Sequence, residues 1–168
     1  MSKALVVYGT KTGCTAGIAE AIGDALRAMG VEADVKRAEA KPELAGYDAV
    51  LVGSGVRAGQ WHGSVKQWLT AHSETLKERP LALFTACLTM AATPEKANEV
   101  RAYTDPLLAE TGLTPVDIGL FAGMNVTKTF SLPERLIMKA MKAPEGDFRD
   151  LEAVAAWTRE AAPMLDLV

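Results

Sequence analysis

The chain has 168 residues, of which 49% are hydrophobic and 23% are charged, and its formal net charge is −3. This composition predicts one water-soluble domain with a single core, and we expect no nucleic-acid partner for it. No apolar run is long enough to cross a membrane, and the first predicted strand begins by residue 4, so we expect neither a membrane span nor a signal peptide, and a cytoplasmic location.

Apolar segments with the spacing of strands and of helices alternate along the chain, which is typical of a parallel sheet covered by helices on both faces. The predicted strands, in order, are 4–8, 32–37, 49–52, 81–84 and about 116–122. The first helix has apolar residues at helical spacing from Ile18 to Met29 and ends at Gly30. Later helices are predicted at 65–76, from Thr93-Pro94-Glu95 to Tyr103, and at 151–161. The chain is therefore predicted to be one doubly wound α/β domain over residues 1–168.

The segment between the first strand and the first helix is the most informative one. It reads Thr10-Lys11-Thr12-Gly13-Cys14-Thr15. A helix N-terminus presents unpaired backbone N–H groups to an anion, the threonine hydroxyls add donors, and Gly13 allows a close approach. The segment lacks the motifs of nucleotide-hydrolysing and dinucleotide-binding loops, so it predicts a cradle for one phosphate monoester. The alternative is a plain turn with capping threonines. We expect Lys11 to be exposed, because hydroxyls and amides can satisfy the phosphate.

Two more unusual segments follow the third and fourth predicted strands. In an open parallel sheet, ligands bind at the carboxyl ends of the strands, so we expect these segments to meet the phosphate cradle in one site. The first segment holds Ser54, Gly55, Val56, Arg57, Gly59, Trp61 and His62. The second holds Thr85, Ala86, Cys87, Leu88 and Thr89. Two cysteines and two distant histidines are too few and too dispersed to predict a metal site or a disulfide framework.

The cradle, with its pattern Thr-x-Thr-Gly-x-Thr, resembles the FMN phosphate loop of the flavodoxin family. Over nearly the whole chain the sequence is similar to the menaquinone-dependent protoporphyrinogen dehydrogenase family of bacteria. The residues that carry this resemblance are Gly53, Arg57, Gly59 and His62, together with 93–96, 121–123 and 150–160. The resemblance implies a flavodoxin-like, five-stranded parallel sheet in the order 2-1-3-4-5, with FMN as cofactor. It also implies that electrons pass from a tetrapyrrole precursor through the flavin to a quinone.

Beside a flavin, four residues of the glycine-rich segment have specific candidate roles. Gly59 is the candidate for a peptide flip on flavin reduction. Arg57 either pairs with a surface carboxylate or stabilises negative charge on the reduced ring or on a substrate. Trp61 either packs in the core or stacks on the isoalloxazine. His62 either caps the next helix or relays a proton. Arg57 and His62 are the two candidate catalytic residues.

An insertion at about 124–149 departs from the family pattern, because it has lost most of the aromatic residues expected there. It predicts a short helix beginning at Ser131, with a capping box to Glu134. The helix has apolar residues and local positive charge; these are Leu132, Leu136, Ile137, Ala140 and Met141, with Arg135, Lys139 and Lys142. Such a helix suits a propionate-bearing substrate, an acidic partner or, through residues 128–142, peripheral contact at the inner membrane face. The alternative is that its apolar side packs on the sheet edge.

The segment at 85–89 has no tyrosine or tryptophan that would cover a flavin face, and the net charge of the chain is modest. An open face and weak charge favour an enzyme, because electron carriers of this fold are typically more acidic. The alternative function is a flavodoxin-like carrier that exchanges electrons with a redox protein and has no substrate of its own.

Overall fold

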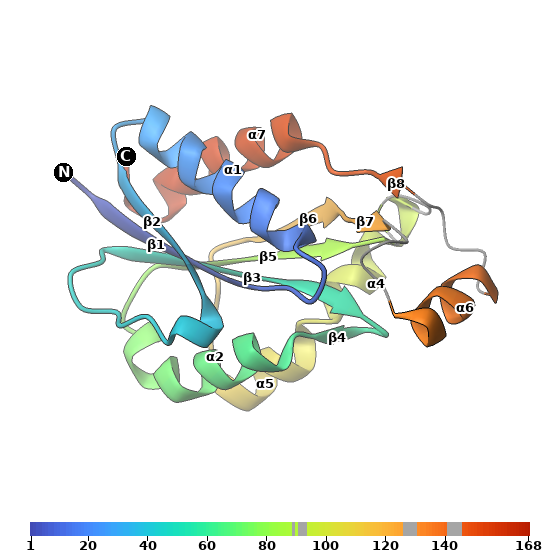
Figure 1. The fold of residues 1–168 in the computed structure, drawn as a ribbon. Coiled ribbons are helices and arrows are strands. Elements are labelled where there is room, and N and C mark those ends of the chain that lie inside the picture. Colours follow the sequence, from blue (N-terminus) through green and yellow to red (C-terminus); the bar gives the residue numbers. More distant parts are fainter. Residues whose placement is uncertain (89, 91–93, 126–130, 141–145) are drawn as a thin grey trace.

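Five parallel strands form the main sheet of the computed structural model, in the order β2-β1-β3-β5-β6 (Figure 1). They are β1 (Lys3–Gly9), β2 (Glu32–Arg37), β3 (Ala49–Arg57), β5 (Leu81–Cys87) and β6 (Ile118–Ala122). The structure describes residues 1–88, 90, 94–125, 131–140 and 146–168. The predicted order 2-1-3-4-5 is confirmed, because these are the five predicted strands taken in sequence. A short additional strand, β4 (Gln60–Trp61), pairs antiparallel with the end of β3.

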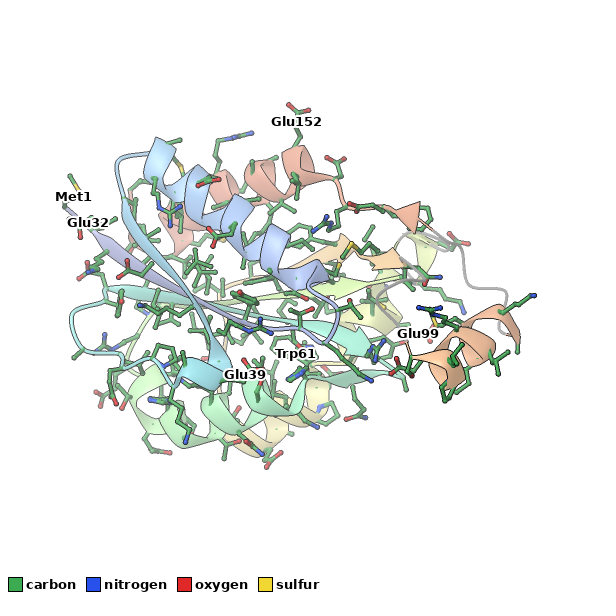
Figure 2. All side chains as sticks on the ribbon, in the orientation of Figure 1. Met1, Glu32, Glu39, Trp61, Glu99 and Glu152 are labelled. Carbon is green, nitrogen blue, oxygen red and sulfur yellow. The ribbon has the colours of Figure 1, made fainter. Side chains whose placement is uncertain are left out.

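Helices cover both faces of this sheet, as predicted. Helices α1 (Cys14–Ala28) and α7 (Leu151–Met164) lie on one face, and α2 (Gly63–Leu76) and α5 (Asp105–Thr111) lie on the other (Figure 1). Because side chains alternate along a strand, Ala4 and Val6 pack in the core under α1, while Leu5 and Val7 pack in the core under α2. Figure 2 shows that side chains fill the space between the sheet and the helices on both of its faces. Burial on both faces explains the continuous apolar runs of the strands.

Strands β3 and β5 extend beyond their predicted ends at residues 52 and 84, towards the carboxyl edge of the sheet. The end of β3 continues because Val56 pairs with Trp61 and Arg57 with Gln60 across a two-residue turn. Both residues of that turn have positive φ, 50° at Ala58 and 73° at Gly59, as a type I′ hairpin turn requires. The segment predicted as a glycine-rich loop is therefore largely a hairpin.

The helix predicted from Thr93 to Tyr103 is divided in the structure. A 3-10 turn at Pro94–Lys96 leads into α4 (Ala97–Ala102), and a separate helix, α5, begins at Asp105. A proline fits the first turn of a helix but not its interior, so Pro106 favours a new helix start at this point. Thr93, the predicted cap, lies outside the described residues.

The insertion contains a short antiparallel pair, β7 (Met124–Asn125) with β8 (Gly146–Asp147), and the helix α6 (Leu132–Ala140). In Figure 1, α6 lies beyond the carboxyl ends of the strands. The backbone N–H of Ser131 donates to Glu134 Oε2 at 3.0 Å, which is one half of the predicted capping box. No residue of α6 is buried, so its apolar side does not pack on the sheet edge. Met141 and Lys142 lie outside the described residues, and no helix in the described part of the chain is long and apolar enough to span a bilayer.

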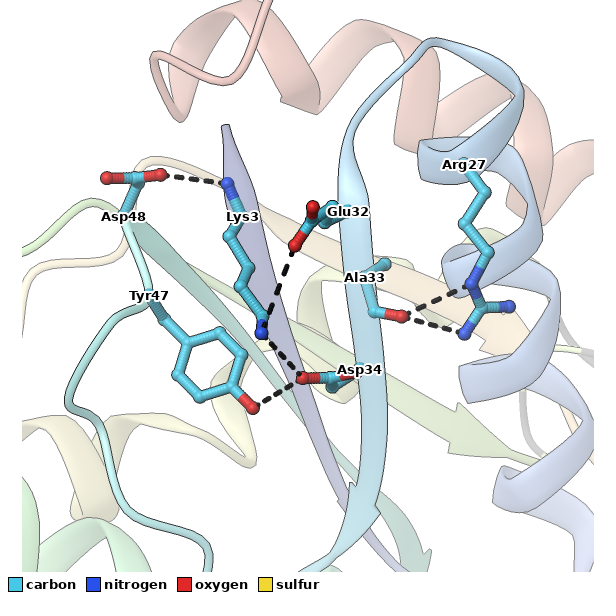
Figure 3. A network of polar contacts seen from close by, with 7 residues as sticks. All are labelled: Lys3, Arg27, Glu32, Ala33, Asp34, Tyr47 and Asp48. Atoms are coloured by element: carbon cyan, nitrogen blue, oxygen red, sulfur yellow. Dashed lines mark hydrogen bonds and ion pairs between the residues drawn. The ribbon is translucent and has the colours of Figure 1, made fainter. Parts of the chain in front are cut away.

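The opposite edge of the sheet, where β1 and β2 begin, is held by a polar network (Figure 3). Lys3 donates its backbone N–H to Asp48 at 2.8 Å, and its Nζ lies 3.4 Å from Asp34 Oδ2. The Tyr47 hydroxyl donates to the same Asp34 oxygen at 2.7 Å. Burial and this hydrogen bond to Asp34 raise the pKa of Tyr47 to about 12, and the bond from Tyr47 lowers the pKa of Asp34. This network joins β1, β2 and the segment before β3.

Candidate functional site

The three segments predicted to form one site lie side by side at the carboxyl edge of the sheet. The strand register aligns Gly9, just before the cradle, with Ser54 on β3. It also aligns Ser54 with Thr85 and Gly55 with Ala86 on β5. Each segment is therefore placed by a strand whose buried part fixes the register, which makes this edge a rigid platform.

The cradle has the geometry of an anion-binding turn at a helix N-terminus. Gly13 is the N-cap of α1 with φ 88° and ψ −4°, a left-handed conformation that glycine adopts without strain. Thr10 Oγ1 accepts the Gly13 N–H at 3.1 Å and so fixes the turn. A Cβ built on Gly13 would meet no described atom within 4 Å, so the space directly beside this residue is open. Thr12 is half-buried beside it, and Lys11 is exposed, as predicted.

Two threonine hydroxyls at this edge are buried and have no hydrogen-bond partner among the described residues. They are Thr15 Oγ1, in the first turn of α1, and Thr85 Oγ1, near the end of β5. A Cβ on Gly55 would lie 3.2 Å from Thr15 Oγ1, so the glycine keeps the end of β3 close to the cradle. Native proteins pair almost all buried polar groups, so unpaired hydroxyls at one edge fit a polar ligand that completes them. A phosphate ester fits this donor set.

The hairpin places His62 at the start of α2, where it is the N-cap. Its Nδ1 accepts the Ser64 N–H at 3.2 Å and lies 2.7 Å from Ser64 Oγ. Its backbone N–H donates to Ser54 Oγ at 2.8 Å, which ties α2 to the end of β3. The capping role considered from the sequence is therefore present. Because Nδ1 accepts a hydrogen bond, the neutral ring carries its proton on Nε2.

Trp61 and the cysteines are enclosed by the protein itself. Trp61 is 4% exposed and belongs to the core beneath α2 (Figure 2), which is the packing alternative of the two considered. Cys14 and Cys87 are both buried, and burial raises the pKa of the Cys14 thiol, which keeps it neutral. Ala86 is buried and Leu88 is half-buried. Thr89 lies outside the described residues.

Arg57 and Lys11 share one carboxylate that the sequence did not connect to them. Arg57 Nη1 donates to Glu134 Oε1 at 3.0 Å, and Lys11 Nζ pairs with the same oxygen. The hydrogen bond from Lys11, followed by those from Ser131 and Arg57, lowers the pKa of Glu134 to about 2. Arg57 thus meets a carboxylate, which was one of its two predicted roles.

Two further arginines reach the cradle and were missed by sequence reasoning. Arg37 lies at the end of β2, with Nη2 3.4 Å from the Thr10 carbonyl; its place follows from the predicted neighbour relation of β1 and β2. Arg149 donates to the Cys14 carbonyl at 3.2 Å and forms a two-bond pair with Asp147. A Cβ on Gly17 would lie 2.3 Å from Arg149 Nη1, so the glycine makes room for the guanidinium. No sequence pattern signalled this second contact.

Among the described residues, no group of three histidine, cysteine or acidic side chains is placed to hold a metal ion. The hydroxyl and backbone N–H groups of this edge are hydrogen-bond donors, and they suit an organic phosphate.

The chain is similar over nearly its whole length to curated enzymes. It is 27% identical over 176 aligned residues to the protoporphyrinogen IX dehydrogenase [quinone] of Escherichia coli (strain K12), covering 98% of this chain and 97% of that protein. It is 24% identical over 164 residues to a Leishmania major protein of the same name, covering 95% of this chain and 71% of that one.

Solved structures agree with this fold. The oxidised flavodoxin 1 of Bacillus cereus superposes with a TM-score of 0.63 at 17% identity, covering 98% of this chain and 99% of that one. An archaeal flavodoxin gives a TM-score of 0.60 at 19% identity with the same coverage. A family profile described as a flavodoxin domain matches residues 5–152. This match supports a flavin cofactor, and the chain belongs to the flavodoxin family.

Proposed function

We propose that this protein is an FMN-dependent oxidoreductase that transfers electrons from a protoporphyrinogen-type tetrapyrrole to a quinone. The observation that carries the proposal is the similarity to curated protoporphyrinogen IX dehydrogenases, which extends over 98% of this chain and 97% of the bacterial relative. The unpaired donors at the carboxyl edge support it independently, because they fit a flavin phosphate.

The cradle residues would hold the FMN phosphate. The first turn of α1 presents backbone N–H groups, and Thr15 adds a buried hydroxyl that has no partner among the described residues. Ser54, Gly55 and the end of β5 would border the ring system, with Thr85 contributing the second unpaired hydroxyl. Bound FMN would supply two-electron redox chemistry, which the side chains present here do not provide.

Two residues of the hairpin would serve that chemistry. Arg57, at the end of β3, would place positive charge beside the ring or a substrate carboxylate, while Glu134 holds its guanidinium. His62 would exchange a proton at Nε2, because its Nδ1 is occupied by Ser64. Gly59, in the left-handed region at φ 73°, would allow a peptide rotation that a side chain at this position would oppose.

Purified protein saturated with FMN tests the proposal directly. Under anaerobic conditions, protoporphyrinogen IX and a menaquinone analogue are added, and the fluorescence of protoporphyrin IX is followed. We expect turnover that requires both the flavin and the quinone. Protein that binds FMN and accepts electrons from a chemical reductant, but oxidises no protoporphyrinogen, would instead be an electron carrier. Arg57→Gln and His62→Asn should each lower kcat while the protein retains FMN.

The helix α6 supports a further part of the proposal, which is peripheral contact with an anionic membrane surface. Leu132, Leu136 and Ile137 are 73%, 68% and 58% exposed, and Arg135 and Lys139 lie on the same short helix. Exposed apolar side chains flanked by cations suit the interface of an anionic bilayer, where a lipophilic quinone resides. We expect co-sedimentation with vesicles that contain anionic lipid and little with purely zwitterionic vesicles. Leu136→Glu should abolish it, and binding that survives this change would contradict the assignment.

A further inference from the structure

Glu134 connects three separate elements at the carboxyl edge of the sheet. Its Oε1 accepts from Arg57 Nη1 at 3.0 Å, at the end of β3, and from Lys11 Nζ, in the cradle. Its Oε2 accepts the Ser131 N–H at 3.0 Å, which fixes the carboxylate at the first turn of α6. One carboxylate thus links the insertion to two of the three segments that form the candidate flavin site.

This bridge matters because little apolar burial holds α6, since Leu132, Leu136 and Ile137 are exposed and Met138 is only half-buried. None of its nine residues is buried, although its apolar side chains are large. Glu134 itself is better covered than its partners, with a side chain 24% exposed compared with 56% for Lys11 and 39% for Arg57. A partly shielded carboxylate with two cationic donors forms stronger hydrogen bonds than a fully exposed pair. This charged contact therefore helps to hold α6 beside the cradle.

The bridge also gives Lys11 a role other than phosphate binding. Lys11 lies between Thr10 and Thr12, and its ammonium group is directed to the insertion helix rather than to the first turn of α1. Release of a ligand held by a loop requires the loop to open, and a loop fixed at one more point opens less often. Fixing the side chain of Lys11 therefore restrains the segment that holds the phosphate.

We propose that Glu134 is a positioning residue that fastens α6 to the cradle through Lys11 and to β3 through Arg57, and thereby slows release of the flavin. This inference rests on the proposed FMN site, and it gives Glu134 a role that the resemblance did not assign. In the opposite arrangement, Lys11 would bind the phosphate and Glu134 would compete with the phosphate for the Lys11 ammonium group. Removing the Glu134 carboxylate would then tighten FMN binding. The sign of the effect separates the two arrangements.

The test is a double-mutant cycle on the FMN dissociation rate. FMN-saturated wild type, Glu134→Gln, Lys11→Gln and the double variant are mixed with an excess of a flavin-trapping apoprotein, and released flavin is followed by fluorescence. We expect each single change to accelerate release roughly two- to fivefold, the range of a partly exposed ion pair. The double variant should release FMN no faster than the faster single variant, because both changes break the same contact. Glu160→Gln removes an exposed carboxylate on α7 and should match the wild type.

A second readout uses the protein without FMN. Trypsin cleaves after Arg135 and Lys139 in α6, and we expect faster cleavage in Glu134→Gln and Lys11→Gln than in the wild type or Glu160→Gln. Tighter FMN binding in Glu134→Gln, additive effects of the two changes, or unchanged cleavage would each overturn the inference. Wild-type protein that binds no FMN would refute the proposed function instead, and the cleavage rates would then decide whether the bridge holds α6.

Discussion

The buried hydroxyl of Thr15 allows the candidate site to be tested by a substitution with opposite effects on stability and binding. Thr15→Val replaces the hydroxyl by a methyl group of nearly the same size and leaves the branched shape unchanged. Thr15 is fully buried, and its Oγ1 has no hydrogen-bond partner in the described part of the chain. Burial of an unsatisfied hydroxyl costs about 1–3 kcal/mol, so its removal should stabilise the protein when no flavin is bound.

The expected magnitudes follow from these environments. We expect the free energy of unfolding of FMN-free Thr15→Val to rise by about 1 kcal/mol, which raises the Tm by about 2–4 °C for a chain of this length. A hydrogen bond to a charged phosphate contributes about 1.5–3 kcal/mol, so the Kd for FMN should increase about 10- to 100-fold. Differential scanning calorimetry measures the first quantity, and quenching of FMN fluorescence measures the second.

Thr158→Val is the matched control. Thr158 is also fully buried, but its Oγ1 donates to the Val154 carbonyl at 2.8 Å within α7. Its removal should therefore give no gain in stability and no change in FMN affinity. If Thr15→Val bound FMN as tightly as the wild type, or lost stability without FMN, the assignment of this hydroxyl to the phosphate would be wrong.

Three other substitutions or titrations follow from local geometry. Gly53→Ala should destabilise the protein by about 1–3 kcal/mol in urea unfolding, because its Cβ would lie 2.0 Å from the buried ring of Phe84; an unchanged midpoint would contradict the packing. Ala58→Gly should raise the free energy of unfolding by about 0.5–1 kcal/mol, since Ala58 has φ 50°, and a loss would contradict the turn assignment. The Glu134 carboxyl should titrate in NMR with a pKa near 2, below its usual 4.5. Its pairing should therefore stabilise the folded protein fully above pH 4.5, and this stabilisation should be lost as the pH falls through 2. Lys11→Gln should move that midpoint upwards.

The centre of the fold was predictable because its strands are buried on both faces. Such strands are apolar without interruption, as in Val50, Leu51 and Val52, and this pattern needs no knowledge of the partner strand. Their carboxyl ends were not predictable in the same way. Gly55 and Ala86 have low strand propensity, and they are extended because they pair with each other across the sheet. Tertiary pairing, not local preference, sets these boundaries.

In the candidate site too, local features could be predicted from the sequence and long-range contacts could not. The cradle was found because its chemistry is local: a strand, a turn with Gly13 and a helix N-terminus are consecutive in sequence. Glu134 was recognised only as part of a capping box, since that contact spans three residues. Its contact with Lys11 joins residues 123 positions apart, and no local pattern records it. Trp61 was ambiguous for a different reason, because a large aromatic side chain fits a core and a ring-stacking position equally well.

The two ends of the sheet differ in how their polar groups are satisfied, and this difference supports the candidate site. At the amino ends of β1 and β2, Asp34 accepts a hydrogen bond from Tyr47 and forms an ion pair with Lys3, so its charge is balanced within the fold. At the carboxyl edge, Thr15 and Thr85 retain fully buried hydroxyls without partners among the described residues. Folding alone favours satisfied polar groups, and departures from that rule are expected where a sequence serves a ligand. An edge that is well packed yet incompletely paired is therefore better explained by binding than by imperfect folding.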